Sequence, residues 1–438
     1  MSTTDVRTTA RADRARILAT WDPEDVGFWE ATGARIARRN LLASVVSEHI
    51  GFSVWTVWSV LVLFLGPDYG FAPAQKFLLT ATPALVGSCL RIPYTVAVAR
   101  FGGRTWTVIS SLLLLIPLVA GAVVLEPGVS FGALLAAAAL AGFGGGNFAS
   151  SMANINAYYP QRLKGWALGV NAGVGNIGVA AVQLVGLLVL ATLGASHPRA
   201  VLGFYLPLVV IAAVMAAVVM DDLRVPCDTG AMRSLVRLPH AWVVSLLYIG
   251  TFGSFIGFGF AFGQVLLVQF PSQFATPVSA AYLTFLGPLV GSLVRPVGGR
   301  LADRFGGAVV TAWTFVGLAA GALVVLTASI QASLPLFVLG FVALFTVSGI
   351  GNGSTYKLIP VVMPDRRRAT ALLGVAGAVG GLGGVLVNVA FRQSFLATGT
   401  GNGAYLAFAV GYLALLGLTW AVYLRPAPSP AVVDAAAA

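Results

Sequence analysis

Five ionisable residues interrupt long apolar runs of this 438-residue chain, namely Glu48, His49, Arg91, Arg295 and Lys357. Arginine suits a planar oxyanion because its rigid fork of N–H donors can bind two oxygen atoms at once. Glu48 is the one acid among the five, and a single carboxylate cannot neutralise two arginines and a lysine. These residue types therefore predict a site for a small anion, with Arg91 and Arg295 as its principal ligands.

The two arginines occupy equivalent positions in an internal repeat. Gly87-Ser-Cys-Leu-Arg91 aligns with Gly291-Ser-Leu-Val-Arg295, and Arg100-Phe-Gly-Gly103 aligns with Arg304-Phe-Gly-Gly307 at the same offset. Each buried arginine would lie about 14 Å along a helix axis from its loop arginine, which places both near mid-membrane. The alternative is that both side chains extend to the cytosolic interface and only anchor the topology. Their depth and repeat symmetry favour a shared site between two halves of the protein.

The composition is that of a membrane protein. Hydrophobic residues make up 58% of the chain and charged residues 9%, whereas a soluble domain has roughly 25% charged residues. The net charge of +11 comes from short clusters of cations between apolar runs, so we expect no nucleic-acid partner. Cys89 and Cys227 offer neither a disulfide framework nor a zinc site, and the three histidines have no metal-ligand spacing. We therefore expect neither a cofactor nor a metal, and no nucleophile–base pair or phosphate loop suggests an enzyme.

A bilayer core about 30 Å thick requires about 20 apolar residues per helix. By this measure the sequence predicts a polytopic α-helical protein with twelve spans, and turn residues cluster at the breaks between them. The first forty residues have no apolar core of the signal-peptide type, and we expect an interfacial helix around Trp21 to Arg39. The predicted spans lie near 41–64, 75–99, 105–125, 131–157, 164–193, 200–220, 241–268, 279–302, 308–329, 334–361, 368–395 and 404–424.

The bias of lysine and arginine predicts the orientation in the cytoplasmic membrane. With the N-terminus in the cytosol, the outer side carries only Lys76, Arg199 and Arg392, and an even number of spans returns the C-terminus to the cytosol. We expect a monomer in contact with the lipid bilayer. The predicted units are a cytosolic tail (1–39), a first six-helix bundle (40–220), a cytosolic loop (221–239), a second six-helix bundle (240–425) and a C-terminal tail (426–438).

Two glycine-rich runs lie inside predicted spans. Gly173, Gly175 and Gly178 fit the spacing of a dinucleotide fingerprint, but no strand precedes them, so we interpret the run as close helix packing that permits sliding. Asn171 and Asn176 are polar exceptions on this surface, and one of them is expected to bond a neighbouring helix backbone. The second run contains Gly377, Gly380 and Gly383.

These motifs carry a family resemblance that extends from about residue 40 to residue 420. The segment 299–307 resembles the loop motif of the major facilitator superfamily, and it has a degenerate partner near Arg100. The runs 142–152, 171–178 and 376–384 resemble the nitrate/nitrite porter (NarK-type) family. This resemblance implies an all-α major facilitator fold, with two six-helix bundles related by a parallel pseudo-two-fold axis. It also implies secondary transport of nitrate and nitrite by alternating access.

The resemblance also implies roles for individual residues. Arg91 and Arg295 correspond to the paired substrate arginines, Asn176 to the signature asparagine that bonds the anion, and Tyr248 to the tyrosine of the seventh span. The rings that sandwich the planar anion correspond to Phe52, Phe148 and Phe252. Nitrate is flat and weakly hydrated, so it loses less solvation between apolar faces than sulfate would.

Glu48 and His49 depart from the pattern of some family members. A carboxylate beside a histidine could load a proton, which nitrate–proton symport would require. Alternatively, Glu48 lies near the cytosolic leaflet and pairs with Lys357 or a loop arginine. We favour nitrate/nitrite exchange, because the returning anion would neutralise the arginines. Proton symport, a facilitator for another small anion and a nitrate sensor remain alternatives.

Overall fold

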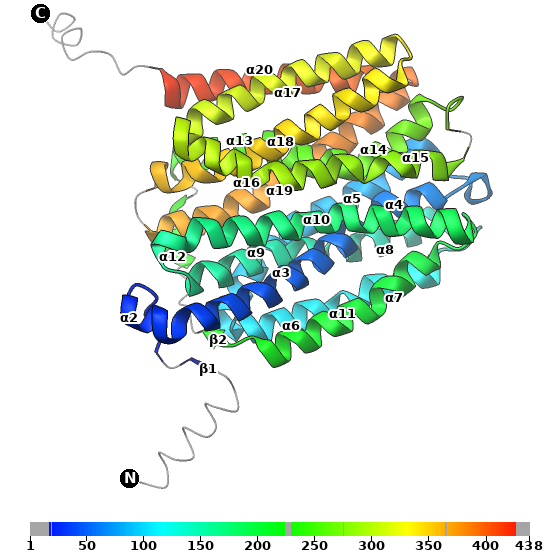
Figure 1. Cartoon of the computed structure of the whole chain (residues 1–438). Coiled ribbons are helices and arrows are strands. Elements are labelled where there is room, and N and C mark those ends of the chain that lie inside the picture. The colour runs from blue at the N-terminus through cyan, green and yellow to red at the C-terminus, as the bar shows by residue number, and fades with distance from the viewer. Residues whose placement is uncertain are drawn as a thin grey trace, which may run out of the picture.

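The computed structural model describes residues 17–18, 20–223, 229–235, 237–274, 276–363 and 366–425. Within them, twelve helices are long and apolar enough to cross a membrane, which confirms the predicted number (Figure 1). The predicted tails before residue 17 and after residue 425 lie outside the described residues, and so does Cys227.

The first six spans form one half of the molecule. Several are built from two helices that follow each other directly, and short turns join the spans. A two-residue strand, β1 (Ile17–Leu18), precedes them and pairs in parallel with β2 (Asp222–Leu223), which follows them. The helices are α2 (Val26–Phe28), α3 (Ala34–Thr56), α4 (Trp58–Phe64), α5 (Pro73–Phe101), α6 (Gly103–Leu113), α7 (Leu115–Val124), α8 (Phe131–Ala141), α9 (Phe143–Tyr158), α10 (Gln161–Leu193) and α11 (Arg199–Val219).

The last six spans form the other half, after a short connecting helix, α12 (Thr229–Leu235). The seventh span contains a π-helical turn, Ile249–Gly253, between its two α-helices. Such turns are frequent at functional sites because they change which side chains face a neighbouring helix. The helices are α13 (Pro239–Tyr248), α14 (Ser254–Gln269), α15 (Pro277–Thr284), α16 (Leu286–Phe305), α17 (Gly307–Ile330), α18 (Leu334–Val362), α19 (Arg366–Thr398) and α20 (Asn402–Thr419).

The two halves are six-helix bundles that lie side by side (Figure 1). They meet along two helix pairs that the repeat relates to each other, α5 with α19 and α10 with α16. Each pair joins the second span of one half to the fifth span of the other. Arg91 lies on α5 and Arg295 on α16, so the repeat places both arginines on helices of the central interface.

The first helix differs from the prediction. Instead of a separate interfacial helix from Trp21 to Arg39, one continuous helical stretch runs from Val26 to Phe64. The Asp25 side chain accepts hydrogen bonds from the first free N–H groups, which fixes the start at Val26. Trp29 is buried and packs on Tyr159 at a centroid distance of 5.6 Å, so this stretch belongs to the bundle.

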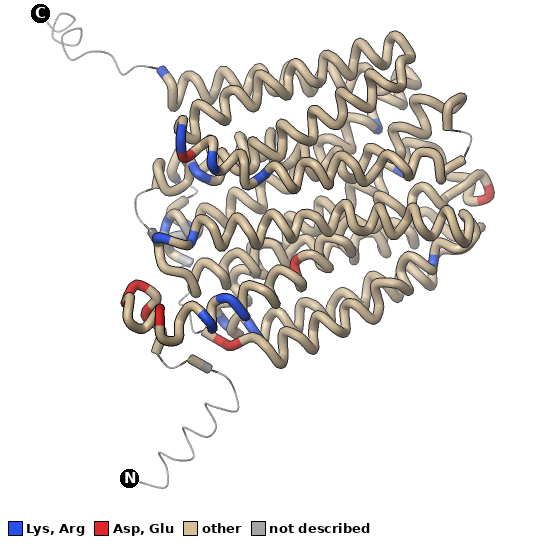
Figure 2. The backbone as a smooth tube through the Cα atoms, in the orientation of Figure 1, with Lys and Arg blue, Asp and Glu red and all other residues tan. Residues whose placement is uncertain are grey.

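Lys and Arg residues gather at the end of the bundles where the described chain begins and ends (Figure 2). A buried acidic pair at this end closes the first bundle. Asp221 accepts from Arg39 Nη2 at 2.6 Å and from Asn40 Nδ2 at 3.0 Å, and Asp222 accepts from the backbone N–H of Thr105 at 3.0 Å. These bonds tie the end of α11 to the starts of α3 and α6.

Candidate anion-binding site

Arg91 is enclosed at the centre of the interface. Its side chain is fully buried, Nε donates to the carbonyl oxygen of Gly145 at 3.2 Å, and Nη1 donates to that of Gly377 on the opposite bundle. Its guanidinium carbon also lies within 5.2 Å of three ring centroids, those of Trp55, Phe148 and Phe252. Ring faces and carbonyls replace part of the lost hydration of this cation. The Arg91 side chain therefore does not extend to the cytosolic surface of the membrane, as the alternative interpretation required.

Arg295 approaches the same cluster from α16. It is 5% exposed, and its Nη2 donates to the Tyr248 hydroxyl at 3.2 Å. Its guanidinium carbon lies 5.5 Å from the Tyr356 ring centroid and 6.0 Å from that of Phe148. Phe148 thus contacts both arginines, and the structure brings the predicted pair together around one ring.

Each arginine has one buried nitrogen that is unpaired within the described residues. Among the described residues, no hydrogen-bond partner is found for Arg91 Nη2 or Arg295 Nη1. Both amide atoms of the buried Asn176 are likewise unpaired within the described part of the chain. Buried polar groups in proteins are nearly always hydrogen-bonded, so these atoms mark a place where a polar ligand would be satisfied. No bond or ring contact among the described residues joins Asn176 to either arginine.

The predicted aromatic residues form one continuous cluster of rings, of which Phe148, Phe252 and Tyr248 are stacked. Phe148 and Phe252 lie 5.8 Å apart between centroids at 22°, and Phe252 stacks on Tyr248 at 5.0 Å. Phe52 meets Phe148 edge to face at 6.0 Å. Two parallel rings that sandwich a planar anion must lie about 7 Å apart, which is twice an ordinary carbon contact distance. The Phe148 and Phe252 centroids are closer than this, so in this conformation the two rings contact each other and leave no room for an anion between them.

The glycines of α10 are positions of close approach within the first bundle. A Cβ on Gly175 would collide with the Glu48 carboxylate, and one on Gly178 would collide with the carbonyl oxygen of His49. Gly173 is different, because its Cβ would reach Pro296 of the opposite bundle at an ordinary 4.0 Å. Two of these three glycines therefore hold α10 against α3, and one lies at the interface where the bundles meet.

The second glycine run repeats this arrangement on α19. A Cβ on Gly380 would strike the Tyr248 ring, and one on Gly383 would lie 2.6 Å from the Cα of Gly253 in the π-helical turn. Gly377 faces the other bundle, where its Cβ would lie 3.4 Å from the Phe148 ring. Gly377 has no side chain, so the α19 backbone lies close enough to Arg91 to accept its hydrogen bond.

Glu48 belongs to a polar cluster beside the arginines. Its Oε2 accepts from Asn171 Nδ2 at 2.5 Å, and the same nitrogen lies 2.5 Å from the Ser151 hydroxyl. Asn171 thus bonds side chains, not the backbone of a neighbouring helix as expected for one of the two asparagines. His49 turns toward the carbonyl oxygen of Val174, with its Nδ1 at 3.2 Å.

Lys357 does not lie at membrane depth as the sequence suggested. Its Nζ pairs with Asp303 at 2.6 Å, and its side chain is 37% exposed near the end of α18. The prediction that Lys357 adds an uncompensated charge to the central site is therefore wrong. The reason is that Asp303, at the end of α16, lies next to Lys357 on α18 and compensates its charge. The alternative pairing of Glu48 with Lys357 is excluded as well.

A cavity of about 780 Å³ leads to Arg295 from the end of the bundles where the described chain begins and ends. The first turns of α10 and the last turns of α16 and α18 line its mouth, with Lys164, Arg300 and the Lys357–Asp303 pair among the lining residues. Asn352 and Tyr356 line its inner part. Cations along a path of this kind attract anions toward the buried arginine.

The bundles close against each other at the opposite end. Thr80 of α5 donates to the Asn388 side chain of α19 at 2.7 Å, and both residues are buried. Phe77 stacks on Phe391 and Phe395 at 5.8 and 5.5 Å. The site is therefore accessible from one end of the molecule and sealed at the other.

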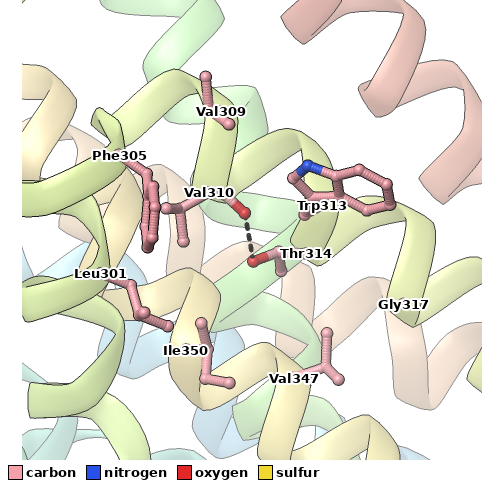
Figure 3. A pocket seen from close by; sticks show the side chains of 9 residues that line it. All are labelled: Leu301, Phe305, Val309, Val310, Trp313, Thr314, Gly317, Val347 and Ile350. Atoms are coloured by element: carbon pink, nitrogen blue, oxygen red, sulfur yellow. Dashed lines mark hydrogen bonds between the residues drawn. The ribbon is translucent and has the colours of Figure 1, made fainter.

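A second cavity of about 430 Å³ lies within the second bundle (Figure 3). Its lining is almost wholly apolar, and the Thr314 hydroxyl is bonded to its own helix at Val310. Trp313 at its edge is 70% exposed on the surface that faces lipid. None of the residues that line this cavity is charged, in contrast to the cavity that leads to Arg295.

Two site residues were missed from the sequence. Tyr356 lies 4.6 Å from Tyr248 between centroids and under Arg295, and Trp55 covers Arg91. Tyr356 has no aromatic counterpart in the repeat, since it aligns with Ser151. Trp55 lies between Phe52 and Trp58, and Tyr356 lies between Thr355 and Lys357, so neither sequence context singles out the residue as one that contacts the arginines.

The comparisons with known proteins agree with this architecture. The profile of the Major Facilitator Superfamily matches residues 49–388. The chain is 38% identical to the nitrate/nitrite transporter NarU of Salmonella typhimurium, with 94% of this chain and 97% of that protein covered. It is 34% identical to the probable nitrate/nitrite antiporter NarK2 of Thermus thermophilus, with 93% and 96% covered.

Solved structures of low sequence identity share the fold. The partially occluded, inward-open xylose transporter XylE from E. coli matches with a TM-score of 0.69 at 15% identity, over 89% of this chain and 98% of that one. An inward-facing bacterial homologue of the lysosomal transporter Spinster matches with a TM-score of 0.66 at 18% identity, with the same coverage. The family profile, which covers most of the chain, and the 38% identity to a nitrate/nitrite transporter over 94% of the chain show that the chain belongs to the nitrate/nitrite porter (NarK-type) family of the major facilitator superfamily.

Proposed function

We propose that this protein is a secondary transporter that exchanges nitrate and nitrite across the cytoplasmic membrane by alternating access. One observation carries the proposal: two buried arginines from repeat-related helices meet around Phe148, and each has an unpaired nitrogen among the described residues. The names of the relatives, which are nitrate and nitrite transporters, supply the substrate class.

In this proposal the anion binds between Arg91 and Arg295. The free Nη2 and Nη1 atoms donate in the plane of the anion, and Tyr248 holds the Arg295 fork in position through its 3.2 Å hydrogen bond. Asn176 donates from α10 after the helices move. Phe52, Phe148 and Phe252 supply apolar faces, and the Phe148–Phe252 stack opens to admit the anion.

The orientation follows from the distribution of charge. Most cations gather at the end from which the 780 Å³ cavity opens, so this end and both chain termini face the cytosol (Figure 2). The structure is then the inward-facing state, with Thr80–Asn388 and the Phe77 stack forming the closed outer gate. One chain contains both halves of the site, so a monomer is sufficient for transport.

Exchange follows from the electrostatics of the site. Two guanidinium charges in a region of low dielectric repel each other when no anion lies between them. The empty carrier therefore crosses slowly between its two states, whereas a carrier loaded with nitrate or nitrite crosses readily. A carrier of this kind exchanges one anion for another.

Counterflow in proteoliposomes tests the proposal. Vesicles containing the purified chain and loaded with nitrite should accumulate external labelled nitrate, whereas vesicles loaded with sulfate should not. Protein-free vesicles measure leakage. Nitrate entry that is the same with internal nitrite and internal sulfate would contradict exchange, and no entry above leakage would contradict transport.

A further inference from the structure

The second cavity is a groove on the outer surface of the second bundle, away from the arginine site. Phe305 of α16, Val310 and Trp313 of α17 and Ile350 of α18 are among the residues that line it (Figure 3). It follows residues 309–317 of α17, which span about 12 Å at 1.5 Å per residue. Phe305 and Trp313 are 53% and 70% exposed, so the groove opens away from the bundle, toward lipid. An apolar groove of this shape can accommodate an acyl chain.

The groove ends at a cationic group of donors. The guanidinium carbon of Arg304 lies 5.0 Å from the centroid of the Phe305 ring, which is part of the groove wall. Arg304 is exposed and has no ion pair among the described residues, whereas the neighbouring Asp303 is paired with Lys357. The helix α17 begins beside it at Gly307, and no side chain of the described residues caps its first N–H groups. Such a helix start next to an arginine favours an oxyanion.

The repeat shows what occupies the corresponding helix start in the first bundle. There the carboxylate of Asp222 accepts from the backbone N–H of Thr105 at 3.0 Å and from the Thr105 hydroxyl at 2.7 Å. A Cβ on Gly102, before α6, would collide with this carboxylate. Gly306 is its repeat equivalent and has nearly the same φ, +89° against +91°, but a Cβ there would have nothing of the described chain within 4 Å. The first bundle thus supplies its own oxyanion, and the second leaves open space at the same position.

The apolar part of the groove differs between the bundles in the same way. In the first bundle Trp106 stacks on Phe101 at a centroid distance of 6.0 Å and meets Tyr94 edge to face at 4.9 Å. The repeat equivalent of Trp106 is Val310, which lines the groove with a much smaller side chain. The first bundle therefore has both an oxyanion and a large apolar group from its own chain where the second has neither among its described residues.

We propose that this groove binds one anionic phospholipid, with an acyl chain along α17 and the phosphate at the start of α17 beside Arg304. In the proposed orientation this lipid belongs to the cytosolic leaflet, whose anionic lipids are attracted by arginine at the membrane surface. One ligand of this class supplies both groups that the first bundle has from its own chain. An apolar transmembrane helix of another protein would fill the groove but would bring no oxyanion to Arg304. The inference does not depend on which anion the protein carries.

Native mass spectrometry of the purified, delipidated full chain tests the inference. Titration with dioleoyl phosphatidylglycerol and with dioleoyl phosphatidylcholine gives a Kd for each lipid. The wild type should bind one phosphatidylglycerol at least about tenfold more tightly than phosphatidylcholine, because the phosphatidylglycerol headgroup carries a net negative charge. Arg304→Gln should weaken phosphatidylglycerol binding about fivefold, since it removes one cation at the headgroup. Arg100→Gln is the matched control, at the equivalent exposed arginine of the first bundle, and should bind within about twofold of wild type.

A second variant tests the apolar part of the groove. Val310→Trp copies Trp106 of the first bundle and fills the space beside Phe305, so it should weaken phosphatidylglycerol binding at least about tenfold. Glycerol 1-phosphate has the phosphate without acyl chains and should not displace the lipid at equal concentration. If Val310→Trp does not fold, Arg304→Gln decides the matter, because the Arg304 side chain is exposed and its loss leaves no cavity.

Four results would overturn the inference. The first is equal affinity of the wild type for the two lipids, and the second is equal affinity of Arg304→Gln and Arg100→Gln for phosphatidylglycerol. The third is displacement of the lipid by glycerol 1-phosphate, which would show a site for any phosphate. The fourth is a dimer of the wild type that Val310→Trp abolishes, which would show that a second copy of the chain occupies the groove.

Discussion

At the scale of single residues, the site depends on how two arginines are kept apart and held in place. Arg91 is fixed by two carbonyl oxygens, one from each bundle, and Arg295 by one tyrosine hydroxyl. Phe148 lies against both guanidinium groups. These contacts hold each planar fork in position before an anion arrives, and pre-organised donors bind more tightly than mobile ones.

Lysine at either arginine should therefore nearly abolish transport although the charge is kept. An ammonium group has no planar fork, so it cannot both hold the neighbouring contacts and bind two oxygens of the anion. Nitrate/nitrite counterflow of Arg91→Lys and of Arg295→Lys should fall by at least about tenfold. Arg199→Lys, at an exposed arginine paired with Glu126, should transport normally. Near-normal counterflow by either site variant at equal expression would refute the paired-arginine site.

At the scale of helices, the repeat made much of the site predictable. The repeat correctly indicated that Arg91 and Arg295 lie on equivalent helices, at an offset of 204 residues. At an offset of 205 residues it also relates Gly175 and Gly178 to Gly380 and Gly383. What these glycines touch could not be predicted, because contacts depend on the rotation of each helix about its axis. Gly175 and Gly178 fit against α3 of their own bundle, so they position the helix and do not form a surface for sliding between bundles.

A large side chain on this surface should disrupt α10. Leucine at Gly175 would meet the Glu48 carboxylate and displace α10 from α3, so counterflow should fall by at least about tenfold. The melting temperature should also fall by several degrees, since overpacking costs about 1–3 kcal/mol. Gly203→Leu is the control, because a Cβ at Gly203 on exposed α11 has nothing within 4 Å. Equal transport and stability of both variants would show that Gly175 has no special packing role.

At the scale of the whole molecule, the fold was predictable because length and hydropathy alone determine twelve spans, and the repeat determines two bundles. The conformational state was not predictable, since the same sequence must populate states open to either side. The structure has a cavity at one end and the Thr80–Asn388 contact at the other. Likewise, the pairing of Lys357 with Asp303 depends on a tertiary contact between helices that the span pattern does not specify.

Removing the contact at the closed end should shift the balance between these states. Thr80→Ala leaves the Asn388 side chain without its 2.7 Å partner and should raise the population open at this end. Spin labels at Ala195→Cys and Ala397→Cys, with both native cysteines replaced by serine, would report the separation of the bundles there. Their distance distribution should gain a longer component in Thr80→Ala. An unchanged distribution would show that this bond does not hold the end closed.

The central claim is that Arg91 and Arg295 bind one anion together, and an experimental structure with bound nitrate tests it most directly. The account predicts planar density between the two guanidinium groups, within hydrogen-bond distance of Arg91 Nη2 and Arg295 Nη1, with Phe148 against one face. Nitrate bound only near Lys164 and Arg300 at the cavity mouth, with no anion between the central arginines, would contradict the account.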